Sequence, residues 1–210
     1  MVLGATLTLL GLIIGFTFSM ALSRYDQRKN YEEAEANAIG TEYVRADLLP
    51  AGDAARVRAL LVNYLEQRML FYTTRDEQQM EQIYAKTSKL HAELWSAVRT
   101  PAFAQPTAVI SLAIAGMNDV LNTQGYTQAA WLNRIPTAAW VVMVAMAIVS
   151  SLLVGIGTKD GKSLSRVLLI LPLILSIAFF LISDIDSPRH GMIHVSPQNL
   201  LLLSKSLRST

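Results

Sequence analysis

Residues 2–29 read VLGATLTLLGLIIGFTFSMALSRYDQRK, and this stretch decides the fold. It carries no charged side chain before Arg24, and charged residues then follow in quick succession. A helix needs roughly 17–25 apolar residues to cross a hydrocarbon core about 30 Å thick, and residues 2–22 are enough. We therefore expect a membrane-spanning helix here. It should continue into water as a charged helix, because the alanine and glutamate residues that follow favour helix.

Two further stretches, residues 135–158 and 167–183, also lack charge and are long enough to span a bilayer. Over the whole chain 52% of residues are hydrophobic and 16% are charged, whereas a soluble domain has about a quarter charged. A short turn-rich segment, residues 155–162, separates the two stretches and predicts a helical hairpin.

The sequence thus predicts an all-α membrane protein with about three transmembrane helices and a large cytoplasmic helical region. The expected domains are the first transmembrane helix at 1–22, the cytoplasmic helices at 23–134, the transmembrane hairpin at 135–183, and a cytoplasmic C-terminal segment with a terminal helix at 184–210. A cleaved signal peptide is the alternative for residues 1–22. Against it, no basic residues precede the apolar run, which exceeds the usual roughly 7–15 residues.

Helix boundaries between the spans follow from capping residues and prolines. Asp53 is a favourable N-cap for one helix, and Thr74 with Glu77 forms a capping box for the next. Pro101 and Pro106 are expected to end that second helix. Near the C-terminus, the pair Ser196-Pro197 is typical of an N-cap followed by the first helical position.

Orientation is predicted from the basic residues that flank the spans, because cytoplasmic loops carry more of them. The side with the charged region has Arg24, Arg28, Lys29, Arg134 and Arg189, and the opposite side has Lys159, Lys162 and Arg166. We therefore place the helical region in the cytoplasm. The net charge is only +2, with no basic stripe of the kind that binds nucleic acid. The absence of cysteine excludes disulfides and cysteine-based metal sites.

One face of the first span consists of small residues at helical spacing, namely Gly4, Thr8, Gly11, Gly15 and Ser19. Such faces let helices approach closely in lipid, either within one chain or around the axis of a symmetric homo-oligomer. Leu12 and Phe16 lie beside this face, one turn apart. In an oligomer, rings of Thr8, Leu12, Phe16 and Ser19 would line a pore, with an apolar constriction that gates by dewetting.

Charged residues next to the spans offer weaker candidates. Arg24, Arg28 and Lys29 would form a basic ring at the pore exit that attracts anions, or they anchor the helix at the membrane surface. The acidic residues Asp184 and Asp186, with glutamates that follow the first span (Glu32, Glu33, Glu35 and Glu42), could hold a hard cation. Salt bridges with nearby arginines are the competing interpretation. His190 and His194 alone supply too few ligands for a metal site.

Catalytic motifs are missing from the sequence. It contains no cysteine nucleophile, no Gly-x-Ser-x-Gly and no phosphate-cradling glycine loop. No charged residue lies in the middle of a span, where proton relays and ion-coupled transporters usually carry one. We therefore expect neither an enzyme nor a cofactor.

Several segments resemble a known family of bacterial membrane proteins. Its pattern matches Ser23-Arg24-Tyr25-Asp26, residues 35–40 (EANAIG), residues 45–50 (RADLLP) and residues 184–188 (DIDSP). This is the bestrophin-like family, whose domain is of unknown function and is distantly similar to bestrophins. The run Leu12-Ile13-Ile14-Gly15-Phe16 looks like the apolar neck of bestrophins, which are pentameric anion channels with four transmembrane helices and an acidic calcium clasp. This chain departs from them in lacking the neck proline and in having Leu12 and Thr8 at positions of aromatic gate residues.

The resemblance implies a homo-oligomeric channel subunit of a bacterial inner membrane, a pentamer if it is like bestrophins. Its partners would then be the lipid bilayer, further copies of itself and small anions. The alternative function is a non-conducting membrane scaffold whose cytoplasmic helices bind a partner protein. A transporter or an enzyme has no residue in its favour beyond the membrane location.

Overall fold

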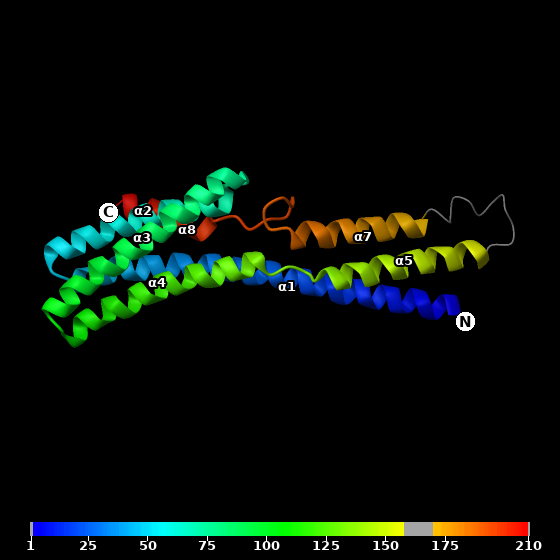
Figure 1. The fold of residues 1–210 in the computed structure, drawn as a ribbon, viewed down its shortest axis with the longest axis horizontal. Coiled ribbons are helices and arrows are strands. Elements are labelled where there is room, and N and C mark those ends of the chain that lie inside the picture. The colour runs from blue at the N-terminus through cyan, green and yellow to red at the C-terminus, as the bar shows by residue number, and fades with distance from the viewer. Residues whose placement is uncertain (1, 158–169, 210) are drawn as a thin grey trace. The chain divides into compact units, whose positions relative to one another are not determined.

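The computed structural model describes residues 2–157 and 170–209, and within those ranges every regular element is helical. The elements in chain order are α1 (Val2–Arg45), η1 (Ala46–Leu48), α2 (Ala51–Thr73), α3 (Glu77–Ala104), α4 (Ala108–Leu132), α5 (Thr137–Gly157), α7 (Ile170–Asp186) and α8 (Gln198–Arg208) (Figure 1). The predicted all-α fold is therefore confirmed for this part of the chain.

Helix α1 runs without a break through 44 residues. At 1.5 Å per residue its length is about 66 Å, roughly twice the thickness of a hydrocarbon core. The apolar first half is therefore long enough to cross a membrane, and the charged half after Arg24 must lie outside the hydrocarbon. This confirms the continuous helix that the sequence predicts, and Gly40 does not interrupt it.

Two stretches of the described chain, Leu3–Leu48 and Ala108–Ile156, contain apolar windows long enough to span a membrane. Helix α7 is apolar up to Ser183, but the predicted third span begins at residue 167, outside the described residues. Of the predicted hairpin loop, residues 155–157 belong to α5, and residues 158–162 also lie outside the described residues. The number of transmembrane helices therefore stays a prediction.

The chain divides into two compact units. The apolar unit comprises α1 up to Asp26 together with Asn133–His194, which includes α5 and α7. The charged unit comprises α1 from Gln27, the helices up to Leu132, and α8. Helix α1 thus contributes its apolar half to one unit and its charged half to the other.

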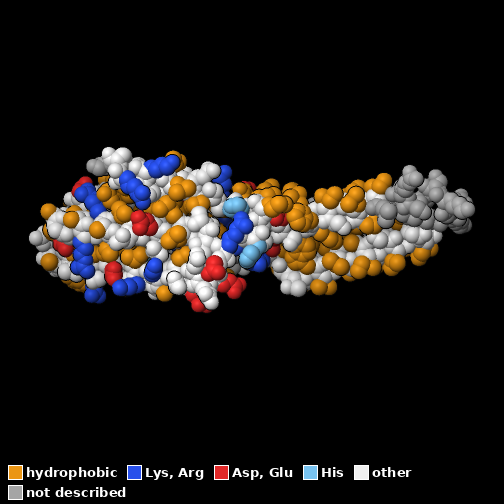
Figure 2. Space-filling model, turned by 90° about the horizontal axis from the view of Figure 1, so that it is seen from above, with side chains coloured by type: hydrophobic (Ala, Val, Ile, Leu, Met, Phe, Trp, Pro, Cys, Tyr) orange, Lys and Arg blue, Asp and Glu red, His pale blue; other side chains and the backbone are white. Residues whose placement is uncertain are grey.

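The apolar unit has a small core where α1, α5 and α7 meet. Its buried members are Ala21, Ile135, Ile182 and Ile185, with Ile14, Tyr25, Ala139 and Trp140 packed against them. Trp140 and Phe179 also meet edge to face. Many large apolar side chains of α5 and α7 are exposed, and apolar side chains gather over the corresponding part of the surface in Figure 2, as expected for helices that face lipid.

The charged unit packs α2, α3 and α4 with the second half of α1, and α8 lies against it (Figure 1). Glu32 on α1 fixes the start of α8. Its carboxylate accepts hydrogen bonds from Asn199 Nδ2 at 2.7 Å and from the Leu200 amide at 3.0 Å. The side chain of Leu200 is buried, so α8 is tied to α1 by both polar and apolar contacts.

Two predicted helix starts are shifted. Helix α2 begins at Ala51 after Pro50, so Asp53 lies in its first turn instead of at the N-cap, where its charge still favours the helix dipole. Helix α3 is capped by Asp76, whose carboxylate accepts the Gln79 amide at 2.8 Å. The predicted cap Thr74 instead follows directly on the end of α2.

Pro101 and Pro197 also take helix positions that differ from the predicted ones. Pro101 lies inside α3, which continues to Ala104. Because Pro101 belongs to the last turn, only its own missing amide is lost from the helical ladder, and its buried ring contributes to packing. Helix α8 starts at Gln198, so Pro197 takes the N-cap position predicted for Ser196.

Gly116 on α4 lies directly against side chains of α1. A Cβ at this position would meet the carboxylate of Glu42, and would lie 2.6 Å from Nη1 of Arg45. Gly116→Val should therefore lower the free energy of unfolding by about 1–3 kcal/mol, because overpacking forces these side chains to move. Thermal unfolding of the detergent-solubilised chain measures the effect.

Gly125→Ala, on the same helix, is the matched control. No atom lies within 4 Å of a Cβ there, so this substitution should raise stability by roughly 0.5–1 kcal/mol. Equal effects of the two substitutions would contradict the close approach at Gly116.

Candidate functional site: the exposed face of helix α1

The small-residue face of α1 is open in the structure. All the residues predicted to pack or to line a pore are exposed, namely Gly4, Thr8, Gly11, Leu12, Gly15, Phe16 and Ser19. Two of them are large apolar side chains, Leu12 at 52% exposure and Phe16 at 64%. The opposite face is buried, with Leu10 only 2% exposed. The predicted site is therefore a continuous surface of one helix.

The glycines of this face touch no other part of the described chain. A Cβ built at Gly4, Gly11 or Gly15 would have no atom within 4 Å. The Thr8 hydroxyl donates to the Gly4 carbonyl at 2.9 Å, within the helix itself. Among the described residues, these glycines therefore make no packing contact inside one chain, which was one of the two interpretations of the small-residue face.

The three basic residues predicted to form a ring differ in how far they are exposed. Arg28 is 1% exposed, and its Nε donates to the Ala130 carbonyl at 3.3 Å. Arg24 lies near Asp186 on α7, with 3.6 Å between Nη1 and Oδ1. Lys29 is exposed.

The acidic residues at the end of α7 bind backbone amides. Asp184 accepts hydrogen bonds from the amides of Met192 at 2.7 Å and Ile193 at 2.8 Å. Both oxygens of Asp186 accept the Ile135 amide, at 3.1 and 3.0 Å. Within residues 2–157 and 170–209, no three His, Asp or Glu side chains come close enough to share a metal ion.

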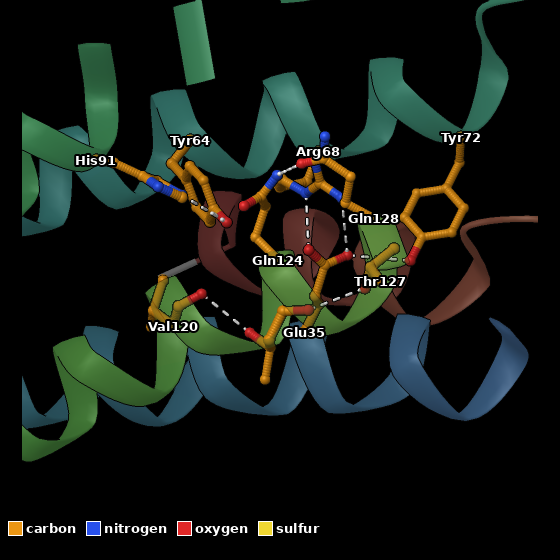
Figure 3. A network of polar contacts seen from close by, with 10 residues as sticks. Glu35, Tyr64, Arg68, Tyr72, His91, Val120, Gln124, Thr127 and Gln128 are labelled. Carbon is orange, nitrogen blue, oxygen red and sulfur yellow. Dashed lines mark hydrogen bonds and ion pairs between the residues drawn. The ribbon is translucent and has the colours of Figure 1, made fainter. Parts of the chain in front are cut away.

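The structure also shows a buried ionic network that sequence reasoning missed (Figure 3). Glu35 on α1 accepts hydrogen bonds from Arg68 Nε at 2.8 Å, from Arg68 Nη2 at 3.3 Å and from the Tyr72 hydroxyl at 3.0 Å. Arg68 and Glu35 are both fully buried. Burial raises the pKa of Glu35, and the neighbouring Arg68 and hydroxyl groups oppose that rise.

Helical spacing contained a signal for this network. Residues about five turns apart, or 18 positions, share one face of an α-helix. Glu35 is 18 positions after the buried Thr17, and Arg28 is 18 positions after the buried Leu10. The charged half of α1 therefore continues the buried stripe of its apolar half.

Comparison with known proteins identifies the family. The sequence model of the family described as Bestrophin-like domain matches residues 1–200. The chain belongs to this bestrophin-like family. The resemblance seen in its sequence motifs is thereby confirmed.

Solved structures share the fold of this bestrophin-like chain. A variant of a bacterial bestrophin homologue from Klebsiella pneumoniae is 14% identical with a TM-score of 0.76, covering 99% of this chain and 85% of that one. Another crystal structure of the Klebsiella homologue, obtained by Zn-SAD phasing, is 14% identical with a TM-score of 0.73, covering 97% and 86%. No curated protein matches the sequence. At this identity the structures support the fold.

Glu42 is a second buried acid in the bestrophin-like chain, located near Gly116 at the crossing of α1 and α4. Neither of its carboxylate oxygens has a hydrogen-bond partner among the described residues. Burial raises the pKa of Glu42 to about 8, with Arg45 opposing the rise and Asp119 adding to it. Near neutral pH this carboxyl group is therefore mostly protonated in the folded chain.

The protonation of Glu42 predicts a pH-dependent stability. The pKa of Glu42 is about 8 in the folded chain, whereas the ordinary pKa of a glutamate is 4.5, so the folded chain holds a proton that the unfolded chain releases. The stabilisation is complete below about pH 4.5 and is lost as the pH rises through about 8. Glu42→Gln should remove this slope and raise the Tm by roughly 2–5 °C near pH 8.

Thermal unfolding between pH 5 and pH 9 tests this expectation. Glu33→Gln, an exposed acid on the same helix, serves as the matched control and should keep the wild-type slope. An unchanged slope in Glu42→Gln would show that Glu42 is not the titrating group.

Proposed function

We propose that this protein is the subunit of a homo-oligomeric ion channel in a bacterial inner membrane. The observation that carries the proposal is the open face of α1, where a Cβ built at Gly11 or Gly15 would meet no neighbouring element within 4 Å and Phe16 is exposed. A membrane helix with a small-residue face is built for close approach to another helix. Family membership supports a channel, because the bestrophins that the sequence distantly resembles are channels.

In the proposed assembly, copies of α1 surround a central axis. Oligomers of one chain usually close with cyclic symmetry, so each side chain of the axial face repeats as a ring. Five subunits are proposed by analogy with bestrophins. Helices α5 and α7 would then face lipid with their apolar outer surface, and the charged unit would form a cytoplasmic vestibule.

The chemistry of the path follows from the order of side chains along α1. Rings of Leu12 and Phe16 form an apolar constriction, which conducts ions only while it is wetted. The hydroxyl groups of Thr8 and Ser19 lie on either side and offer hydrogen bonds to ions that leave the constriction. Phe16 is the larger side chain and should narrow the path most.

Phe16→Ala should increase the current of the purified protein in planar bilayers. The substitution removes a large apolar surface and adds no charge, so the constriction wets more readily. Leu12→Ala should act in the same direction. Conductance at fixed voltage is the measurement, with size-exclusion chromatography to show that each variant stays assembled.

Leu173→Ala is the control, because this exposed residue of α7 faces lipid in the proposed assembly. It should leave the conductance unchanged. If wild type and Phe16→Ala both remain silent across a range of voltage, pH and calcium, the channel function is wrong and the scaffold alternative takes its place.

Assembly depends on the glycine face in this proposal. Replacing both Gly11 and Gly15 by Ile would fill the space that a neighbouring helix needs. The oligomer should dissociate, which mass photometry in detergent or nanodiscs detects. Gly155→Ile on α5, where a Cβ also meets no atom within 4 Å, should keep the wild-type mass. An intact Gly11→Ile, Gly15→Ile oligomer would place the subunit interface elsewhere.

A further inference from the structure

The chain that follows α7 folds back onto the end of that helix. The carboxylate of Asp184 accepts hydrogen bonds from the amides of Met192 at 2.7 Å and Ile193 at 2.8 Å. A side chain at Gly191 would collide with the Asp184 carbonyl oxygen, so the backbone is closely packed there. The loop of residues 187–194 is therefore a compact turn that returns Met192 and Ile193 to the level of Asp184.

Asp184 marks the end of the apolar part of α7. The described helix carries no charged side chain before it, and Ser183 is the last residue of the uncharged run. The start of α5 lies at the same level, because both oxygens of the nearby Asp186 accept the Ile135 amide, at 3.1 and 3.0 Å. The 187–194 loop therefore lies where the membrane-spanning part of the apolar unit meets water.

Aromatic side chains of the apolar unit support this position of the boundary. Tyr25 and Trp140 pack against the small core that includes Ile135 and Ile185. Tyr25 directly follows Arg24, the first charged residue of α1. Tyrosine and tryptophan are enriched where a membrane meets water. Residues of α1, α5 and α7 thus place the boundary at the same end of this unit.

The 187–194 loop exposes large apolar side chains at this boundary. Met192 is 72% exposed and Ile193 is 39% exposed. The imidazole Nδ1 of His194 donates to the Met192 carbonyl at 3.1 Å, which further holds this part of the loop. Interfacial segments bury such side chains roughly 5–10 Å deep, at the boundary between headgroups and acyl chains. The loop therefore has the form of an apolar anchor.

Exposed groups that attract phosphate lie at the same end of the apolar unit. Arg134 directly precedes Ile135 and is exposed, and His190 in the loop is also exposed. Arg134 takes part in no ion pair within residues 2–157 and 170–209. The acids Asp184 and Asp186 are bound to backbone amides. Figure 2 shows histidine and basic side chains beside the apolar surface.

We propose that the 187–194 loop lies in the membrane interface and binds anionic lipids. Met192 and Ile193 enter the lipid layer, while Arg134 and His190 contact the lipid phosphate groups. Basic residues next to a transmembrane helix attract anionic headgroups, and an apolar anchor combined with charge holds a membrane more firmly than either alone. The inference needs only the membrane location of the family and does not depend on the proposed channel function.

The position of the loop is tested on the full-length protein, which has no cysteine. Met192→Cys then supplies a single site for an environment-sensitive fluorophore such as nitrobenzoxadiazole. In nanodiscs, lipids with a spin label near the headgroup should quench this probe at least about twofold, because the side chain lies among them. The matched control is the same probe at Phe103→Cys, an exposed position of the charged unit, which should stay unquenched. Equal quenching at both positions overturns the insertion.

The preference for anionic lipid is tested by thermal unfolding of the detergent-solubilised chain. Phosphatidylglycerol should raise the Tm more than phosphatidylcholine at the same concentration, because a ligand that binds the folded state stabilises it. Arg134→Gln, His190→Gln should remove at least about half of this difference. Lys86→Gln, Arg99→Gln removes two exposed cations from α3 and should keep the difference at its wild-type value.

Glycerol phosphate distinguishes a lipid surface from a soluble anion. It should leave the Tm unchanged at the concentration at which phosphatidylglycerol acts. Equal stabilisation by glycerol phosphate overturns the lipid assignment, and equal stabilisation by the two lipids overturns the role of Arg134 and His190. None of these results decides the channel function, which the current of the Phe16→Ala variant tests separately.

Discussion

The structure depends on one constraint, which is that α1 continues as a single helix from its apolar half into its charged half. An α-helix turns by about 100° per residue, so residues 18 positions apart share one face of an unbroken helix. Leu10, Thr17 and Ala21 define the buried stripe in the apolar unit. The same stripe in the charged unit consists of Arg28, Glu35 and Ile39. The charged side chains of Arg28 and Glu35 are therefore buried, although charged residues are usually exposed to water.

Burial of these charges requires partners, because an unpaired charge in the interior costs far more than a pair. Arg68 supplies two hydrogen bonds to Glu35, and the carbonyl of Ala130 accepts one from Arg28. A well-packed apolar pair could be as stable as Glu35 with Arg68, so the network is better explained by specificity, as it aligns α1 with α2 in one register. Glu42 has no comparable partner, and it avoids the cost by holding a proton.

Because structural charges occupy the buried stripe, the opposite face of α1 is available for function. It is open from Gly4 to Asn37 and changes from small and apolar to acidic and polar. The acids at the end of α7 illustrate the same division of roles. Asp184 and Asp186 accept hydrogen bonds from backbone amides of the apolar unit, to which they belong, so they hold the backbone of this unit instead of gathering as cation ligands. Whether a charged residue of this chain holds the fold or is available for function therefore depends more on its exposure than on its type.

The sequence by itself determined the features that depend on local composition and helical spacing. These are the all-α fold, the apolar stretches long enough to span a membrane, the small-residue face of the first span, and the family. Only the tertiary structure decided which charges face inward, because the partners of Glu35 and Arg28 lie 33 and 102 positions away. The length of a helix and its local hydrogen bonds depend on residues that are close in sequence. The burial of a side chain depends on contacts between distant segments of the chain.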